Sequence, residues 1–128
     1  MKKTKTIAKL KKDLDKVFNA FIRKRDEDHR CWGWFVCLSC GETKDRSYMH
    51  ASHFYAATFL ATRWDERNVN GCCVKCNVFL HGNLLEYRKG MIAKYGIEVV
   101  NELEDLHNKP VKLDRGWLEE RIKHYKNA

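Results

Sequence analysis

The chain has 128 residues, of which 44% are hydrophobic and 33% charged, and its formal net charge is +8. This length predicts one domain with a modest core, and no run of eighteen apolar residues is present that would span a membrane. The basic N-terminus is not followed by the apolar stretch of a signal peptide, so we expect a cytoplasmic protein whose thiols stay reduced. Six cysteines in such a compartment favour metal binding over disulfides.

The N-terminal segment, residues 1–30, is predicted to be a basic helical extension. Apolar side chains recur at helical spacing over residues 8–25, and Lys9, Lys12 and Lys16 fall on the polar face of that helix. The segment carries eleven Lys and Arg against five Asp and Glu, so most of the positive surplus lies here. A clustered basic surface is typical of proteins that bind DNA phosphates, although a solvated helix face has the same composition.

The core domain is predicted to span residues 31–96 and contains two C-x-x-C pairs. The aromatic, short-period stretches "CWGWFVCLSCG" and "SYMHASHFY" predict two small strands around a knuckle. Two such pairs supply the four thiolates of a closed zinc site, whereas a redox role would not explain two pairs. The predicted zinc ligands are Cys37, Cys40, Cys73 and Cys76. Cys72 does not fit the pair spacing and is interpreted as a small buried residue, and Cys31 has no assigned role.

Three further segments complete the predicted organisation. Residues 55–71 have the composition of a loop with some local helix. Helical spacing returns over residues 77–96, with a stop at Gly96. The C-terminal part, residues 97–128, is predicted to form a helix over 97–107 and a last helix that Asp114 caps, both packing on the core.

The gap between the two cysteine pairs is longer than a zinc ribbon requires. Thirty-two residues separate Cys40 from Cys73, against about 15 to 20 in a simple ribbon. The surplus leaves room for a functional hairpin and loop, and it contains the stretch "HASHF". Within and after it, His53 lies fifteen residues before Asn68 and twenty-four before Asn77.

Two C-x-x-C pairs, a histidine at a strand end, a mid-loop asparagine and an asparagine after the last cysteine resemble the HNH, or ββα-metal, nucleases. More closely, the chain resembles the NinG/Rap family of phage recombination endonucleases. The matching stretches are "FNAFIRKRD", "CLSCG", "HASHFY", "RWDERNVNGCCVKCN" and "GNLLEYRKGMIAKYG". The resemblance implies an α+β fold with a zinc-stapled, treble-clef-like ββα-metal core flanked by N- and C-terminal helices.

The resemblance also implies a function. It points to a metal-dependent, structure-selective DNA endonuclease that hydrolyses branched recombination intermediates, such as Holliday junctions or D-loops, in the cytoplasm of a phage-infected bacterial cell. Branched or single-stranded DNA would be the substrate, and a host recombinase is a candidate partner. A homodimer would supply the two active sites that symmetric resolution of a junction needs. The alternative is a non-catalytic, zinc-stapled DNA-binding protein on the same scaffold.

The same resemblance implies roles for the histidine and the two asparagines. His53 would be the general base that takes a proton from the attacking water. Asn68 would orient the histidine and its loop, unless it is an ordinary turn residue. Asn77 would be a ligand of a catalytic ion, and its amide oxygen suits Mg²⁺ or Mn²⁺.

The chain departs from the family pattern around this histidine. Ser52 stands where many HNH nucleases have Asp, and His50 stands where NinG-like sequences have their acid. Residues 50 and 52 of an extended strand face the same side, so His50 is a candidate metal ligand that would favour softer ions such as Mn²⁺, Ni²⁺ or Zn²⁺. His81, four residues after Asn77, would share a helix face with it and is a further candidate ligand, or else a phosphate contact or surface residue.

Two other features bear on DNA binding. The stretch "HRCWGWF" is an insertion relative to the family, and its alternating Trp32 and Trp34 would either cover a small core or stack on an unpaired base. Arg88 and Lys89 follow the metal helix. Arg88 is a candidate phosphate clamp, because guanidinium binds phosphate oxygens in a fork, or it belongs to an ordinary helix surface.

Overall fold

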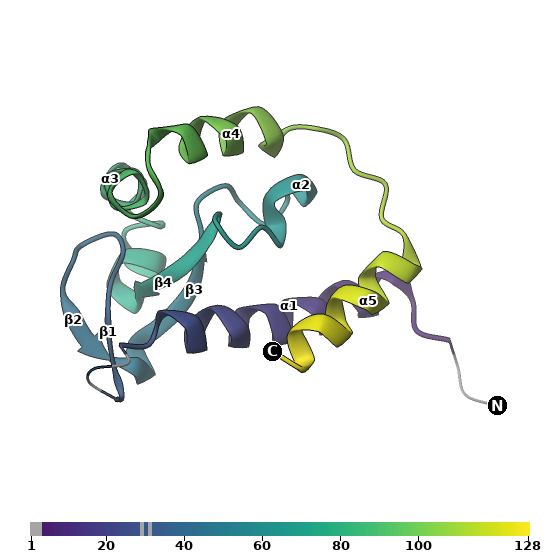
Figure 1. Cartoon of the computed structure of the whole chain (residues 1–128), viewed down its shortest axis with the longest axis horizontal. Coiled ribbons are helices and arrows are strands. Elements are labelled where there is room, and N and C mark those ends of the chain that lie inside the picture. Colours follow the sequence, from purple (N-terminus) through teal and green to yellow (C-terminus); the bar gives the residue numbers. More distant parts are fainter. Residues whose placement is uncertain (1–3, 29, 31) are drawn as a thin grey trace.

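The computed structural model describes residues 4–28, 30 and 32–128, and it is a mixed α+β structure of helices and small sheets (Figure 1). Cys31, to which the sequence assigns no role, lies outside the described residues. The elements are α1 (Ile7–Asp26), β1 (Trp34–Val36), β2 (Thr43–Asp45), η1 (Arg46–Tyr48), β3 (Met49–His53), α2 (Leu60–Arg63), β4 (Val69–Cys73), η2 (Lys75–Phe79), α3 (Leu84–Tyr95), α4 (Ile97–His107) and α5 (Arg115–Lys126). Over the described residues, no helix has the length and apolar character needed to cross a membrane.

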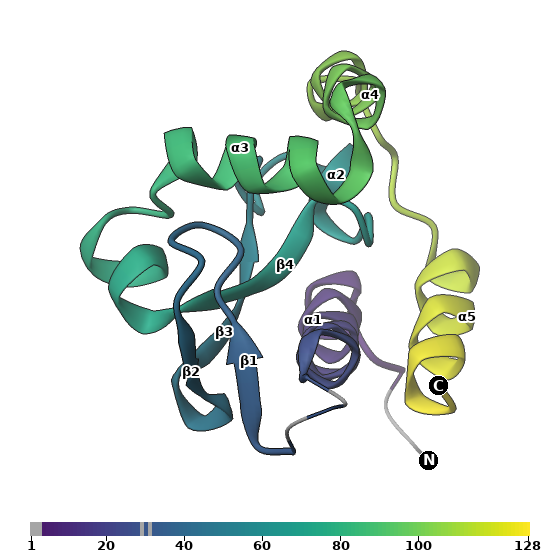
Figure 2. The same cartoon turned by 60° about the vertical axis from the view of Figure 1, so that its left-hand side comes forward.

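Helix α1 confirms the predicted N-terminal helix and packs one face against α5, which lies alongside it in two views (Figures 1 and 2). The Thr6 side chain caps its first turn by accepting a hydrogen bond from the Lys9 N–H at 3.1 Å. Its buried residues, spaced four apart, are Leu10, Leu14, Phe18 and Ile22. At its last turn, Asp26 accepts a hydrogen bond from the Gly71 N–H at 2.7 Å, which ties α1 to β4.

The strands form two antiparallel hairpins, β1–β2 and β3–β4. In the second hairpin His50 faces Cys72 and His53 faces Val69. The expectation of a loop over residues 55–71 is wrong at its end, because β4 already begins at Val69. All five residues of β4 are buried, so the strand lacks the alternation of polar and apolar residues that marks a half-exposed strand.

The single helix expected over residues 77–96 is also wrong. A π-helical turn, η2, ends at Phe79, and α3 begins only at Leu84. Three consecutive residues between them have positive φ: His81 at 50°, Gly82 at 93° and Asn83 at 49°. Left-handed residues terminate a helix, so His81 does not share a helix face with Asn77 as predicted. The end of α3 before Gly96 agrees with the sequence.

Helix α3 lies close against the turn of the first hairpin. A Cβ added to Gly90 would lie 2.3 Å from the Leu38 carbonyl oxygen, so only glycine permits this approach of helix to knuckle. Tyr87 and Met91 of the same helix are fully buried in one hydrophobic cluster with three of the predicted zinc ligands, Cys37, Cys73 and Cys76. The fourth predicted ligand, Cys40, is exposed. The position of α3 is therefore set by the cysteine-bearing loops.

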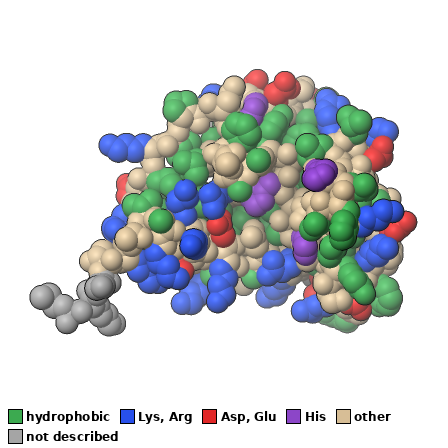
Figure 3. All heavy atoms as spheres, turned by 180° about the vertical axis from the view of Figure 1, so that it is seen from behind, with side chains coloured by type: hydrophobic (Ala, Val, Ile, Leu, Met, Phe, Trp, Pro, Cys, Tyr) green, Lys and Arg blue, Asp and Glu red, His purple; other side chains and the backbone are tan. Residues whose placement is uncertain are grey.

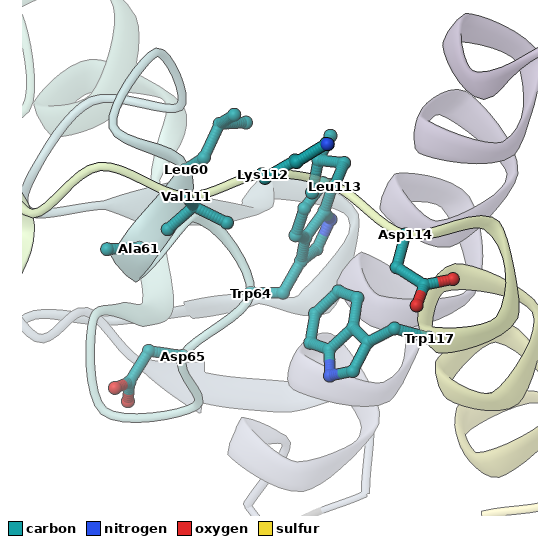
Figure 4. A pocket seen from close by; sticks show the side chains of 9 residues that line it. All are labelled: Leu60, Ala61, Trp64, Asp65, Val111, Lys112, Leu113, Asp114 and Trp117. Carbon is teal, nitrogen blue, oxygen red and sulfur yellow. The ribbon is translucent and has the colours of Figure 1, made fainter.

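The last two helices agree with the sequence. Helix α4 has the bounds predicted for it, and Asp114 caps α5 by accepting a hydrogen bond from the Gly116 N–H at 2.7 Å. Between α2, the segment before α5 and α5 itself lies a largely apolar cavity of about 500 Å³, in which Trp64 and Trp117 face one another (Figure 4). None of the predicted site residues lines this cavity.

Candidate metal centre and histidine–asparagine cluster

The two cysteine pairs meet in space. Cys37 and Cys40 lie on the turn of the β1–β2 hairpin, and Cys73 and Cys76 lie where β4 passes into η2. The four sulfur atoms all lie within 4.8 Å of one another, and Cys40 Sγ is 3.9 Å from Cys73 Sγ. Tetrahedral Zn–S bonds of about 2.3 Å require sulfurs about 3.8 Å apart. The four thiols could therefore hold a metal ion such as zinc, as the spacing predicted.

Neighbouring donors stabilise charge on these sulfurs. The Cys73 N–H donates to Cys37 Sγ at 3.2 Å, and Asn83 Nδ2 donates to Cys76 Sγ at 3.6 Å. A hydrogen bond from the buried Cys72 thiol lowers the pKa of Cys37 to about 4. Burial raises the pKa of Cys40 and raises that of Cys76 to about 12. Metal binding at this cluster would therefore release protons and weaken in acid.

Cys72 is confirmed as a buried residue, with no exposed surface. Its sulfur lies 3.5 Å from Ser39 Oγ, and its bond to Cys37 raises its own pKa. Cys72 thus forms a hydrogen bond with the predicted ligand Cys37 without belonging to the four-cysteine cluster, whereas its neighbour Cys73 belongs to it.

On one face of β3, His50 and Ser52 converge on Asn77. Ser52 Oγ donates to Asn77 Oδ1 at 2.7 Å, and Asn77 Nδ2 lies 2.9 Å from His50 Nδ1. Since the amide nitrogen can only donate, His50 Nδ1 is the unprotonated ring nitrogen and presents a lone pair. The two side chains that strand alternation predicted on one face, His50 and Ser52, therefore both contact Asn77.

His53 lies on the other face of β3, because successive strand residues point to opposite sides. Its Nε2 lies 3.0 Å from the Arg63 carbonyl oxygen. A carbonyl only accepts, so Nε2 carries the proton and Nδ1 is the basic nitrogen. Burial lowers the pKa of His53 below its usual 6.5, which keeps the ring neutral at pH 7. Arg63 is fixed in turn by Asp15 of α1, at 2.6 Å.

Asn68 is fully buried and ties together the loop that follows His53. Its Nδ2 donates to the carbonyl oxygens of Tyr55 at 3.0 Å and Thr62 at 3.1 Å, and its Oδ1 accepts from the Tyr55 N–H at 2.9 Å. Thr62 precedes Arg63, so Asn68 orders the backbone that anchors His53.

The predicted DNA contacts are exposed. Lys9, Lys12 and Lys16 lie on the outer surface of α1, where Lys9 pairs with Asp13 at 2.8 Å. Arg88, Lys89 and His81 are likewise exposed, and Lys89 pairs with Glu86 at 3.0 Å. Figure 3 shows histidine side chains at the surface of one face, with Lys and Arg side chains along the lower edge of the same face.

The sequence did not point to every residue that supports this region. Tyr87 is fully buried and donates from its hydroxyl to the Ser52 carbonyl oxygen at 2.6 Å, while its Oη accepts from Asn70 Nδ2 at 3.2 Å. It thereby joins α3 to both strands of the second hairpin. Its only signal in the sequence is an aromatic residue within the matching stretch "GNLLEYRKGMIAKYG", which does not identify its partners.

Comparison with known proteins gives one consistent result. A family model described as Bacteriophage Lambda NinG protein matches residues 1–128. Protein ninG of Escherichia phage 933W is 37% identical over 98 residues, and the proteins of the same name from Escherichia phage lambda and Salmonella phage P22 are each 36% identical over 98 residues. These matches cover 77% of this chain but only 45% or 46% of each relative, so the chain spans just under half their length. No solved structure matches the chain.

Proposed function

The chain belongs to the bacteriophage lambda NinG family, and from this premise we propose that it is a metal-dependent DNA endonuclease of the HNH type that cuts branched DNA in a bacterial cell. The observation that carries the proposal is the contact of His50 with Asn77 on a strand that ends in a neutral, anchored histidine, His53. A protein that only binds DNA would need neither the amide–imidazole pair nor the anchored base.

The His50–Asn77 pair suits a divalent ion. Neighbouring ligands of an octahedral ion bound at about 2.1 Å lie about 3.0 Å apart, and His50 Nδ1 and the Asn77 amide are 2.9 Å apart. Asn77 would present its oxygen to the ion after a rotation of the amide, and Ser52 would then face the amide nitrogen. An imidazole ligand favours Mn²⁺ over Mg²⁺. When bound, the ion would stabilise negative charge on the scissile phosphate.

His53 would act as the general base. The Arg63 carbonyl fixes its tautomer, so the Nδ1 lone pair can take a proton from a water molecule as that water attacks phosphorus. The bond from phosphorus to the 3′ oxygen breaks in the same step, and a bound metal ion would stabilise the negative charge on that leaving oxygen. Asn68 holds the loop that carries this carbonyl, and so its role is positioning. The four cysteines would maintain the fold with a zinc ion, leaving hydrolysis to the His50–Asn77 pair on one face of β3 and to His53 at the end of the same strand.

The test is single-turnover cleavage of a labelled four-way junction and a linear duplex of the same length, with Mg²⁺ or Mn²⁺. Wild-type protein should cut the junction, and His53→Ala should lose about 10²- to 10⁴-fold in rate while keeping its zinc, fold and junction affinity. His124→Ala, which changes an exposed histidine of α5, is the control and should cut at the wild-type rate. Full-rate cutting by His53→Ala would exclude this mechanism, and no cutting by wild type with either metal would favour a DNA-binding protein.

A junction cut symmetrically requires two such sites, so we further propose that the protein acts as a homodimer on its substrate. Sedimentation of the protein with and without a four-way junction measures this directly. Two chains per junction are expected, and one chain per junction at saturation would contradict it.

A further inference from the structure

A second surface feature lies at the start of β3, away from the histidine end of that strand. It is a hollow of about 670 Å³ between the last turns of α1, the segment before β1, and η1. Figure 2 shows the end of α1 beside β1. Three cationic side chains and an indole line it: Arg23, Lys24, Arg46 and Trp32. The volume falls within the range of about 300 to 1,000 Å³ that is usual for small-ligand sites.

The charges in this hollow favour an anion. Arg23 and Lys24 are exposed, and in the described part of the chain no carboxylate forms an ion pair with either of them. The one acidic side chain in the lining, Glu27, is buried and already engaged, since it accepts hydrogen bonds from the Gly33 N–H at 3.0 Å and from Arg46 at 3.3 Å. The accessible cations are therefore available to phosphate oxygens.

The indole adds a second kind of contact. Trp32 is 76% exposed, and Trp34 is 44% exposed, so the interpretation of these residues as a cover for a small core is wrong. An exposed indole beside arginine and lysine is the chemistry that binds an unpaired base, because the base stacks on the ring while its phosphates meet the cations. A base inside a duplex is already stacked on its neighbours and cannot use such a ring.

We propose that this hollow binds one unpaired nucleotide of a branched DNA, with the base stacked on Trp32 and the flanking phosphates held by Arg23, Lys24 and Arg46. The inference rests on the proposed function and specifies its substrate class. Met49 lines the hollow and begins β3, and His53 ends that strand, about 13 Å away at 3.3 Å per residue. At about 3.4 Å per nucleotide of one DNA strand, that distance corresponds to about four nucleotides. A cut is therefore expected about four nucleotides from the unpaired base.

The test measures binding without added Mg²⁺ or Mn²⁺, so that it does not depend on cleavage. Fluorescence anisotropy compares a labelled duplex carrying a single-nucleotide bulge, the same duplex with an abasic bulge, and the fully paired duplex. Wild-type protein should bind the nucleotide bulge about 5- to 150-fold more tightly than the abasic bulge, the range expected from stacking one base on an aromatic ring. Trp32→Ala should remove this preference and leave affinity for the paired duplex within about twofold.

Two control variants make the result specific. Trp32→Phe keeps an aromatic face and should retain most of the preference, while Trp117→Ala changes an indole that is 44% exposed on α5 and should retain all of it. Equal affinity of the wild type for the nucleotide and abasic bulges, or an undiminished preference in Trp32→Ala, would overturn the proposal. If the protein prefers the nucleotide bulge but cuts no DNA, the nucleotide site is supported and only the proposed nuclease function is overturned.

Discussion

Two features of its surroundings determine the tautomer and the protonation state of His53. The Arg63 carbonyl oxygen accepts a hydrogen bond from Nε2, and burial removes water from the ring. Burial lowers the pKa of His53, so at a pH between the lowered value and 6.5 the unfolded chain binds more protons than the folded chain. The stability that this residue contributes is therefore complete above pH 6.5 and is lost as the pH falls through the folded-state pKa. The neutral ring that folding favours is also the form that a general base requires.

We therefore expect the cleavage rate of the wild type to be level above pH 6.5 and to fall only at more acidic pH. The melting temperature should also fall in acid. When the pH is lowered from 7 to 5, the melting temperature of the wild type should fall by more than that of His53→Gln, because only the wild type has the buried imidazole. A pH–rate profile and thermal melts at the two pH values measure these effects. A midpoint of the rate profile above 6.5 would contradict the assigned environment of His53.

His50 is the residue through which metal preference can be changed. Its contact with Asn77 Nδ2 suits a carboxylate as well as an imidazole, because both accept a hydrogen bond from the amide. His50→Asp should shift cleavage toward Mg²⁺ relative to Mn²⁺, since hard oxygen ligands suit Mg²⁺. His124→Asp, at an exposed position of α5, is the control and should leave the preference unchanged. Rates across Mg²⁺, Mn²⁺ and Ni²⁺ decide the point, and identical profiles for wild type and His50→Asp would remove His50 from the metal site.

At the level of single residues, the sequence predicted which cysteines meet and that residues 50 and 52 share a face, because both follow from fixed spacing. It did not predict that Ser52 would donate to Asn77, since that bond depends on how η2 lies against β3. The prediction that His81 shares a helix face with Asn77 was wrong because it assumed helical geometry across a segment where the backbone is left-handed.

At the level of elements, strong helical patterns in the sequence predicted helices correctly. Features that depend on tertiary packing could not be predicted from the sequence. Helices α1, α4 and α5 follow from apolar spacing and caps, and the structure reproduces them within one or two residues of the predicted bounds. The break between η2 and α3 was missed although Gly82 and Asn83 are residue types that favour positive φ, because the apolar spacing on either side suited one continuous helix. Strand β4 was hidden because it is buried on both faces.

The outer face of α1 is the element predicted to bind DNA electrostatically. Lys9 shares Asp13 with Lys5, so Lys12 and Lys16 are the better test of this face. Replacing both with alanine should weaken junction binding and reduce the slope of log K against log salt by up to about 1.8, at about 0.9 per phosphate contact. The double change Lys109→Ala with Lys112→Ala, at exposed positions between α4 and α5, is the control of equal charge. If the α1 variant matches the control in affinity and slope, α1 does not touch DNA.

Across the whole molecule, the second hairpin separates two hydrophobic clusters. One contains Cys37, Cys73 and Cys76 together with α3 and α4, and the other contains α1, Trp64 and α5. Strand β4 contributes to both, with Val69 in the α1 cluster and Cys73 in the cysteine cluster. A metal ion at the cysteines would thus stabilise the half of the molecule that positions η2 and Asn77, while the α1–α5 pair is held by apolar packing.

Removing one zinc ligand should therefore unfold the cysteine-bearing half. Structural zinc contributes about 10 to 16 kcal/mol of apparent binding free energy in small domains, which matches or exceeds the roughly 5 to 15 kcal/mol that stabilises a typical folded protein. Cys73→Ser should lose the metal and the dispersed amide NMR signals of β3, β4 and α3. Cys72→Ser, one residue earlier and also fully buried, should keep one zinc per chain and lose only about 1 to 3 kcal/mol through its altered contact with Cys37. Elemental analysis with NMR spectra of both variants measures the difference, and a fully folded protein without metal would show that the cysteine cluster is not a structural zinc site.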